Sequence, residues 1–276
     1  MEKFLTDMHT HSTPASHDGR DSLAAMLCEA QKRGVAFYGV SEHFDYDYDV
    51  DKMSPEEYAA TRNGDEAEYF HSARHLQEDY EGVMNVIVGA EFGYSEKQDV
   101  QGRYALTYEK YRPDFVINSI HSLDGVDYCR RVFTETKADI YGGYLRLIRK
   151  SLDAPYHYDI VGHIGYIARY VPFEDRSFSL KEFGDEIDDI LKTIIAKDKI
   201  LEVNSATKNL PQLCLPDVDI LQRYYDLGGR KVSFGSDSHL KERILDKRGQ
   251  IVFALKKIGF TYITVPCKWE HIKVEI

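Results

Sequence analysis

Short apolar runs rich in β-branched and aromatic residues recur along the 276-residue chain, and segments with helical patterning separate them. We predict seven strands, at residues 3–9, 36–43, 85–92, 114–121, 158–163, 200–204 and 231–237. We predict helices at residues 21–33, 55–81, 138–152, 180–198, 216–228 and 241–258. This alternation indicates βα units and a parallel sheet. Seven units favour a barrel over an open sheet, although periodicity alone does not decide between them.

The composition restricts the class of protein and its partners. Hydrophobic residues make up 43% of the chain and aromatic residues 12%, which is enough for a packed core. The net charge of −11 argues against a nucleic-acid partner, which would need clustered Lys and Arg. We instead expect a small-molecule partner, and a phosphorylated one remains compatible because bound cations can supply positive charge locally. No internal repeat or linker marks a boundary, so we expect a single domain over residues 1–276.

The cysteines and the apolar stretches bear on localisation. The four cysteines lie far apart and form no CxxC pair, so neither a disulfide framework nor a thiolate zinc site is expected. The segment MEKFLTDMH lacks the features of a secretory signal, and no apolar stretch is long enough to span a bilayer. We therefore expect a cytoplasmic protein with no membrane partner. The sequence indicates no particular oligomeric state.

Side chains of types that can bind metal ions, namely His, Asp or Glu, lie at the ends of six of the seven predicted strands. The end of the first strand lies within DMHTHSTPASHDG, residues 7–19, which contains several candidates. The other candidates, in chain order, are His43, Glu91, His121, His163, Asp237 and His239. Because parallel strands of a barrel end at one mouth, these side chains are expected to converge there.

The types of these side chains indicate the kind of metal site. Imidazoles and carboxylates without thiolates suit Zn, Mn, Fe or Co, and the set is too large for one tetrahedral ion. A single histidine at a strand end is more often structural than a ligand, but the joint placement at six strand ends favours metal binding. We therefore predict a hydrolytic site with several metal ions. We assign no role to His71, His75, His157 or His271, which lack such neighbours.

The motifs DMHTHS, SEH, GAEF, SIHS, GHIG, EVN and FGSDSH, in this order, resemble those of the polymerase and histidinol phosphatase (PHP) family. The resemblance covers essentially the whole chain. It implies a distorted (β/α)7 TIM-like barrel that holds a trinuclear metal cluster at the C-terminal ends of its strands. The size of the chain and the HTHSTPASH segment are similar to the branch of the family that hydrolyses L-histidinol phosphate.

The resemblance also implies ligands for two or three divalent ions, which we expect to be Mn, Zn or Fe. A first ion would be held by His9, His11, Glu91 and Asp237, and a second by His17, His43 and His239. A third would be held by His121 and His163, with Glu91 bridging it to the first. The pair at 17–18 offers two candidates; His17 has the family's spacing, and Asp18 is the alternative.

The expected chemistry is phosphate-monoester hydrolysis by a metal-bridging hydroxide, with Glu91, Asp237 and His239 as catalytic residues. No protein nucleophile is expected, because the chain lacks GxSxG and P-loop motifs. Arg169 is a candidate clamp for the phosphate and Lys208 a weaker one. Either residue could equally be a surface cation with no such role.

The resemblance implies hydrolysis of L-histidinol phosphate in histidine biosynthesis as the function. A related alternative is a PHP-type phosphoesterase that acts on small nucleotides or other phosphate esters. An amidohydrolase-type enzyme also begins with an HxH strand, but Glu91 and the DSH ending fit the PHP pattern better. A non-enzymatic metal-binding module would predict lost ligands, and none is apparent.

Overall fold

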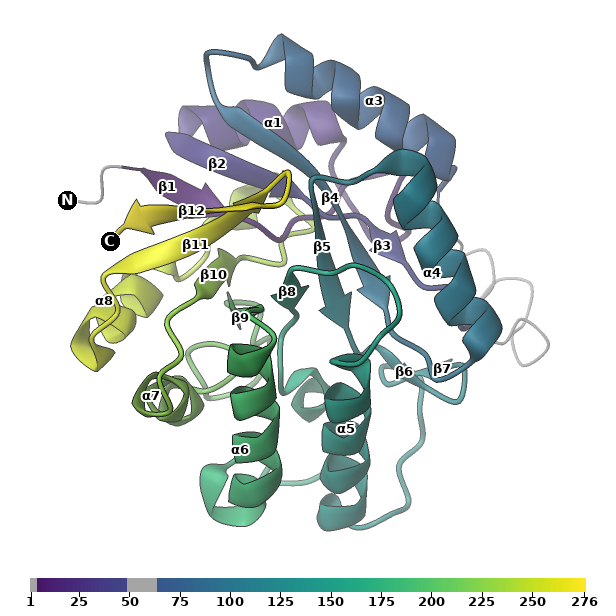
Figure 1. Ribbon diagram of the computed structural model, residues 1–276, viewed down its shortest axis with the longest axis vertical. Helices are drawn as coiled ribbons and strands as arrows, with labels where there is room; N and C mark the ends of the chain where they lie inside the picture. The colour runs from purple at the N-terminus through teal and green to yellow at the C-terminus, as the bar shows by residue number, and fades with distance from the viewer. Residues whose placement is uncertain (1–3, 49–63) are drawn as a thin grey trace.

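The computed structural model describes residues 4–48 and 64–276, and its centre is a nearly closed barrel of parallel strands surrounded by helices (Figure 1). Neighbouring strands follow the order β1-β2-β4-β5-β8-β9-β10, and each neighbouring pair is parallel. The bounds are β1 Leu5–Asp7, β2 Val35–Val40, β4 Asn85–Gly93, β5 Phe115–Ser119, β8 Ile160–Val161, β9 Ile200–Asn204 and β10 Val232–Gly235. The predicted α/β barrel of seven strands is confirmed.

The seam between the first and last barrel strands is closed by backbone hydrogen bonds. Met8 N donates to Phe234 O at 2.9 Å, and Asp237 N donates to His9 O at 2.8 Å. A parallel bridge between Thr10 and Ser238 extends the closure beyond both strands. The residues after β1 and β10 are therefore held side by side.

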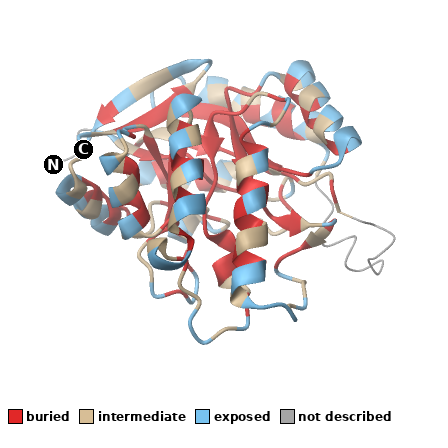
Figure 2. Ribbon diagram, turned by 60° about the horizontal axis from the view of Figure 1, so that its bottom comes forward, coloured by how far each residue is buried: buried red, intermediate tan, exposed pale blue. Residues whose placement is uncertain are grey.

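The helices cover the outside of the barrel. Their bounds are α1 Leu23–Lys32, α3 Glu66–Asp79, α4 Gln98–Tyr111, α5 Lys137–Ser151, α6 Leu180–Ala196, α7 Val218–Asp226 and α8 Arg248–Ile258. Each turns buried apolar side chains towards the strands and exposes its opposite face (Figure 2). Short 3₁₀ segments, Tyr166–Arg169 and Lys241–Arg243, follow β8 and β10. None of the helices in the described ranges has both the length and the apolar character that a membrane crossing requires.

Helix α4 (Gln98–Tyr111) was not predicted, because its tyrosines and Gly102 obscure the apolar pattern. Its buried residues are nevertheless Val100, Tyr104, Thr107 and Tyr108, which have the spacing of one helix face. Counting tyrosine as a core residue would have identified this helix.

Three predicted segments had wrong boundaries. The strand predicted at 36–43 is interrupted after Val40, and a separate short strand, β3 (His43–Phe44), pairs with β4. Within the predicted helix at 55–81, Gly64 and Asp65 are not helical and α3 runs from Glu66 to Asp79, with Asp65 accepting a hydrogen bond from Glu68 N; residues 55–63 lie outside the described residues. The helix predicted at 241–258 begins at Arg248.

A C-terminal hairpin that was not predicted closes the end of the barrel opposite the mouth. Strands β11 (Tyr262–Cys267) and β12 (Glu270–Glu275) pair antiparallel, and the hairpin lies across the end at which β4 and β5 begin (Figure 1). Val265 and Val274 join an interior apolar cluster with Phe115 and Ile117 of β5. The barrel interior is thus filled below by apolar side chains, and its polar residues gather at the other end. A second short hairpin, β6 (Ser122–Leu123) with β7 (Val126–Asp127), follows β5.

Candidate metal centre and active site

Glu91 of β4 lies at the centre of the barrel mouth and is fully buried. Its Oε1 is 2.9 Å from His163 Nε2 and 3.1 Å from His121 Nε2. Its Oε2 is 2.9 Å from His43 Nδ1 and 3.3 Å from His9 Nε2. One carboxylate therefore contacts imidazoles from the ends or starts of four different strands. This is the position expected of a carboxylate that bridges two metal ions.

Asp237 and His239 meet the first histidines because of the closed seam. Asp237 follows β10 with a left-handed φ of 52°, and its Oδ1 lies 3.4 Å from His11 Nε2 and 3.9 Å from His9 Nε2. The His239 ring lies 4.4 Å, between centroids, from that of His11. In the described residues, overlapping groups of three side chains have donor atoms close enough together to hold a metal ion. These groups are His9, His11 and Asp237; His9, Glu91 and His163; His43, Glu91 and His121; and His11, His43 and His239. The structure thus brings eight of the nine predicted metal ligands together.

His17 is the predicted ligand outside these groups. Its ring centroid lies 6.0 Å from that of His43. Its neighbour Asp18 is closer to the cluster: Asp18 Oδ2 is 2.9 Å from His239 Nε2, and its Oδ1 is 3.7 Å from His43 Nε2. Of the two candidates at positions 17 and 18, the structure places Asp18 against the other histidines.

The donor atoms in the mouth fit the requirements of bound cations. Within the described part of the chain, His9 Nε2 and His11 Nε2 are buried and make no hydrogen bond, and they face Glu91 Oε2 at 3.3 and 3.6 Å. A buried polar atom without a hydrogen bond is costly, and a bound ion would satisfy several of these atoms together. Imidazole and carboxylate donors are also what zinc, manganese or iron accept. The residues present therefore fit a group of divalent ions.

The protonation of the cluster reflects its mixture of carboxylates and imidazoles. Burial raises the pKa of the Glu91 carboxyl, but His9, His121 and His43 outweigh burial and hold this pKa well below its usual range. Burial lowers the pKa of His43, but the carboxylates of Glu91 and Asp18 outweigh it and raise this pKa to about 9. Burial, followed by the neighbouring imidazoles of His43 and His239, lowers the pKa of His11 well below its ordinary value. Carboxylates that stay ionised are suited to holding cations.

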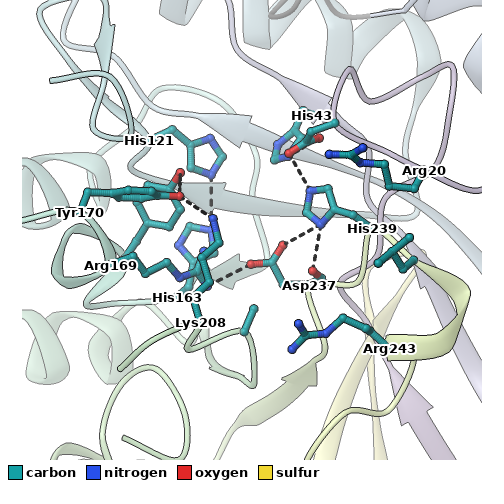
Figure 3. A pocket seen from close by; sticks show the side chains of 14 residues that line it. Arg20, His43, His121, His163, Arg169, Tyr170, Lys208, Asp237, His239 and Arg243 are labelled. Atoms are coloured by element: carbon teal, nitrogen blue, oxygen red, sulfur yellow. Dashed lines mark hydrogen bonds and ion pairs between the residues drawn. The ribbon is translucent and has the colours of Figure 1, made fainter. Parts of the chain in front are cut away.

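A cavity of about 370 Å³ opens directly above the cluster (Figure 3). His43, His121, His163, Asp237 and His239 line its floor, and Tyr166, Tyr170, Ala206 and Leu240 belong to its walls. Four cationic side chains also line it: Arg20, Arg169, Lys208 and Arg243. This charge suits a small anionic ligand.

The two predicted substrate-binding residues both face this cavity. Arg169 Nη2 lies 3.1 Å from Asp237 Oδ2 and 3.3 Å from Asn204 Oδ1, and the side chain is nearly buried. Lys208 is more exposed, and its Nζ donates to Tyr170 Oη at 2.9 Å. Arg169 is thus fixed beside the cluster, while Lys208 lies at the cavity wall.

Two carboxylates that were not predicted as partners of the cluster, on the buried Glu202 and on the largely covered side chain of Asp45, contact the outer nitrogens of cluster histidines. Glu202 Oε1 lies 2.5 Å from His9 Nδ1, and Asp45 Oδ1 lies 2.9 Å from His121 Nδ1. Glu202 belongs to β9, the one predicted strand without a metal-binding residue at its end. An acidic residue two positions before the end of a strand, on the same face as Asn204, was the signal that could have identified it.

A parallel α/β barrel with imidazoles and carboxylates gathered at its mouth defines a barrel protein equipped to bind metal ions at a hydrolase-like site. The model of the PHP domain family matches residues 7–206. The chain belongs to the PHP domain family.

Individual relatives match over nearly their whole length. The chain is 29% identical over 245 residues to the "Probable histidinol-phosphatase" of Clostridium acetobutylicum, with 87% of this chain and 89% of the relative covered. It is 25% identical over 270 residues to the histidinol-phosphatase of Lactococcus lactis, with 94% and 93% covered. A crystal structure of histidinol phosphate phosphatase from Lactococcus lactis, complexed with zinc, L-histidinol and phosphate, superimposes with a TM-score of 0.84 at 24% identity, and covers 98% of this chain and 99% of that one. This last likeness shows the shared fold.

Proposed function

We propose that the protein is a metal-dependent phosphatase that hydrolyses L-histidinol phosphate to L-histidinol and phosphate. The observation that carries the proposal is the position of Glu91, whose two oxygens face imidazoles on opposite sides beneath a cationic cavity. Relatives matched over most of their length carry the name histidinol-phosphatase, which supports the choice of substrate. Histidine biosynthesis is the corresponding pathway.

We assign two or three divalent ions to the mouth of the barrel. His9, His11, Glu91 and Asp237 would hold one, and Glu91, His121 and His163 another. For the remaining position we propose His43, His239 and Asp18, in place of His17, because Asp18 approaches both histidines. Bound ions would supply an acidified water, with a pKa of about 7 in favourable zinc sites, and would neutralise charge on the phosphoryl oxygens.

The side chains around the cluster have separate tasks in this proposal. Glu91 and Asp237 stay ionised and hold the cations, because neighbouring histidines keep the pKa of both carboxyls well below the usual range despite their burial. The Arg169 guanidinium donates hydrogen bonds to a phosphoryl oxygen from the cavity wall, which orients the ester for in-line attack. The position of Asp237 Oδ2 against Arg169 fixes this guanidinium before substrate arrives.

The test is the turnover of L-histidinol phosphate by protein reconstituted with manganese, beside a metal-stripped control. We expect turnover that disappears on stripping and returns with manganese. A panel of phosphate monoesters and diesters tests the substrate class, and faster turnover of diesters or nucleotides would refute the assignment. Glu91→Gln tests the bridging role: we expect lower metal content and the loss of most of the activity, since the bound ions would supply both the nucleophile and the charge neutralisation.

A further inference from the structure

Glu202 is a buried carboxylate of β9 that uses both of its oxygens on residues of the proposed metal centre. Its Oε1 lies 2.5 Å from His9 Nδ1, and its Oε2 accepts a hydrogen bond from His163 N at 2.6 Å. His9 follows β1 and His163 follows β8, so one side chain connects two segments that meet only at the barrel mouth. Glu202 itself is 1% exposed and lies beneath the histidines, outside the lining of the cavity.

The neighbouring strand makes room for this carboxylate. Gly235 of β10 lies alongside, and a Cβ built there would stand 2.3 Å from Glu202 Oε1 and 2.6 Å from His9 Cβ. Any side chain at position 235 would therefore displace the contact. Along β9, Ile200 points into the apolar interior of the barrel and Leu201 into the layer under the helices. Glu202 lies two residues after Ile200 on the same face of β9. It is therefore the first polar residue of this strand above the apolar interior of the barrel.

The contact determines which nitrogen of His9 can bind a cation. With Nδ1–H donated to Glu202, the lone pair of Nε2 points towards Glu91 and Asp237, at 3.3 Å and 3.9 Å from their nearest oxygens. A carboxylate cannot donate a hydrogen bond when ionised, so it accepts from His9 and from His163 N without conflict. Carboxylate partners of this kind fix the tautomer and orientation of histidine ligands.

We propose that Glu202 is a positioning residue that sets the Nδ1–H tautomer of His9 and holds His9 and His163 in the relative positions that metal binding requires. The inference rests on the proposed metal centre and is independent of the substrate. Ser16 Oγ is the neighbour of His11 Nδ1, at 3.3 Å, and a backbone carbonyl is that of His239 Nδ1, at 3.0 Å. Compared with these two histidines, His9 has the stronger, charged partner, and its ring belongs to two of the ligand groups, with Glu91 and His163 in one and with His11 and Asp237 in the other.

Glu202→Gln is nearly isosteric and changes only the hydrogen-bonding pattern. The glutamine has one acceptor oxygen for two donors, and its amide can donate to His9 Nδ1, which would move the ring proton to Nε2, the atom that faces the cluster. We expect the affinity for the first zinc or manganese ion to fall about 10- to 100-fold, the usual effect of losing such a partner.

Asp159→Asn is the matched control. Asp159 is also buried, and its Oδ2 accepts a hydrogen bond from Val116 N, away from the ligand groups. Metal-stripped wild type, Glu202→Gln and Asp159→Asn are titrated with zinc against a chromogenic chelator. The proposal expects weaker binding in Glu202→Gln alone, and a lower melting temperature in both variants.

Two outcomes overturn the proposal in different ways. Equal zinc affinity of Glu202→Gln and wild type would reduce Glu202 to a structural residue, while the metal centre would stand. Failure of the wild type to bind zinc would remove the metal centre and the proposed function together. If Glu202→Gln does not fold, ¹⁵N NMR of histidine in zinc-loaded wild type decides: His9 bound through Nε2 with a proton on Nδ1 supports the proposal, and binding through Nδ1 refutes it.

Discussion

Arg169 and Asp237 form an ion pair at the floor of the cavity, with 3.1 Å between Nη2 and Oδ2. The other carboxylate oxygen of Asp237 faces His11. A single aspartate therefore contacts both the guanidinium proposed to bind phosphate and an imidazole proposed to bind metal. The position of Asp237 thus sets the phosphate-binding group relative to the metal-binding groups.

Replacing Arg169 by alanine tests the phosphate clamp. A hydrogen bond to a charged group contributes about 1.5–3 kcal/mol, and each 1.4 kcal/mol corresponds to about tenfold. We expect kcat/KM for L-histidinol phosphate to fall about 10- to 100-fold, together with weaker inhibition by inorganic phosphate. Arg243→Ala is the control, because Arg243 also lines the cavity but pairs with Asp246 at 2.6 Å. An equal loss in both variants would show a general effect of charge instead of a clamp.

The barrel and most of its mouth could be predicted from sequence, because strands that end in His, Asp or Glu converge wherever parallel strands close. His121 and His163 illustrate this: they are 42 positions apart in the chain, yet their Nε2 atoms are 3.4 Å apart. The polarity of the strand ends predicted that these side chains converge, while the resemblance to the PHP family was needed for the distorted seven-stranded barrel and for the grouping of the ligands.

Other features depended on three-dimensional packing that a sequence pattern does not contain. The choice between His17 and Asp18 depends on the path of a turn, and both residue types can bind metal. Glu202 looked like an ordinary strand residue because its partners, His9 and the backbone of His163, come from distant segments. Helix α4 packs through tyrosines, so the rule that counts aliphatic residues missed it.

A pair of variants separates the two candidate ligands in the turn after β1. Asp18→Ala removes a carboxylate that lies 2.9 Å from His239 Nε2, so we expect one metal ion fewer per chain and a loss of activity. His17→Ala removes a ring that belongs to none of the ligand groups found in the described residues, and we expect it to retain full metal content. Elemental analysis of both purified variants gives the answer. Loss of an ion from His17→Ala alone would restore His17 as the ligand.

Metal binding is expected to release protons at neutral pH. The pKa of His43 in the metal-free protein is raised to about 9, mainly by Glu91 and Asp18 against the effect of burial, so His43 is protonated at pH 7. A metal ion binds the neutral imidazole and must displace this proton. The release should therefore be present at pH 7 and decline as the pH rises through about 9. Calorimetric titration with zinc in buffers of different ionisation enthalpy measures it, and proton uptake at pH 7 would contradict the charge assignment.

Gly89 and Gly102 offer a matched test of the barrel interior. A Cβ at Gly89 of β4 would lie 2.3 Å from the ring of Phe115, which fills the barrel, whereas a Cβ at Gly102 of helix α4 would meet nothing within 4 Å. Overpacking a core costs about 1–3 kcal/mol, so Gly89→Ala should lower the free energy of unfolding in urea by about that amount. Gly102→Ala should raise it by about 0.5–1 kcal/mol, because alanine loses less conformational entropy in a helix.

The two substitutions are expected to change the free energy of unfolding in opposite directions, so a general effect of alanine cannot explain both results. The Phe115 ring contacts Gly89 from inside the barrel, and its own place there is fixed by the hairpin residues Val265 and Val274 beneath it. The ring therefore has little freedom to move away from the new methyl group, and the strand must shift instead. Because Glu91 lies two residues further along β4 on the same face, a shift at position 89 should also reduce metal affinity. If Gly89→Ala left both the stability and the metal binding unchanged, the barrel interior would have space for the added methyl group, and the close packing of Phe115 against Gly89 would be refuted.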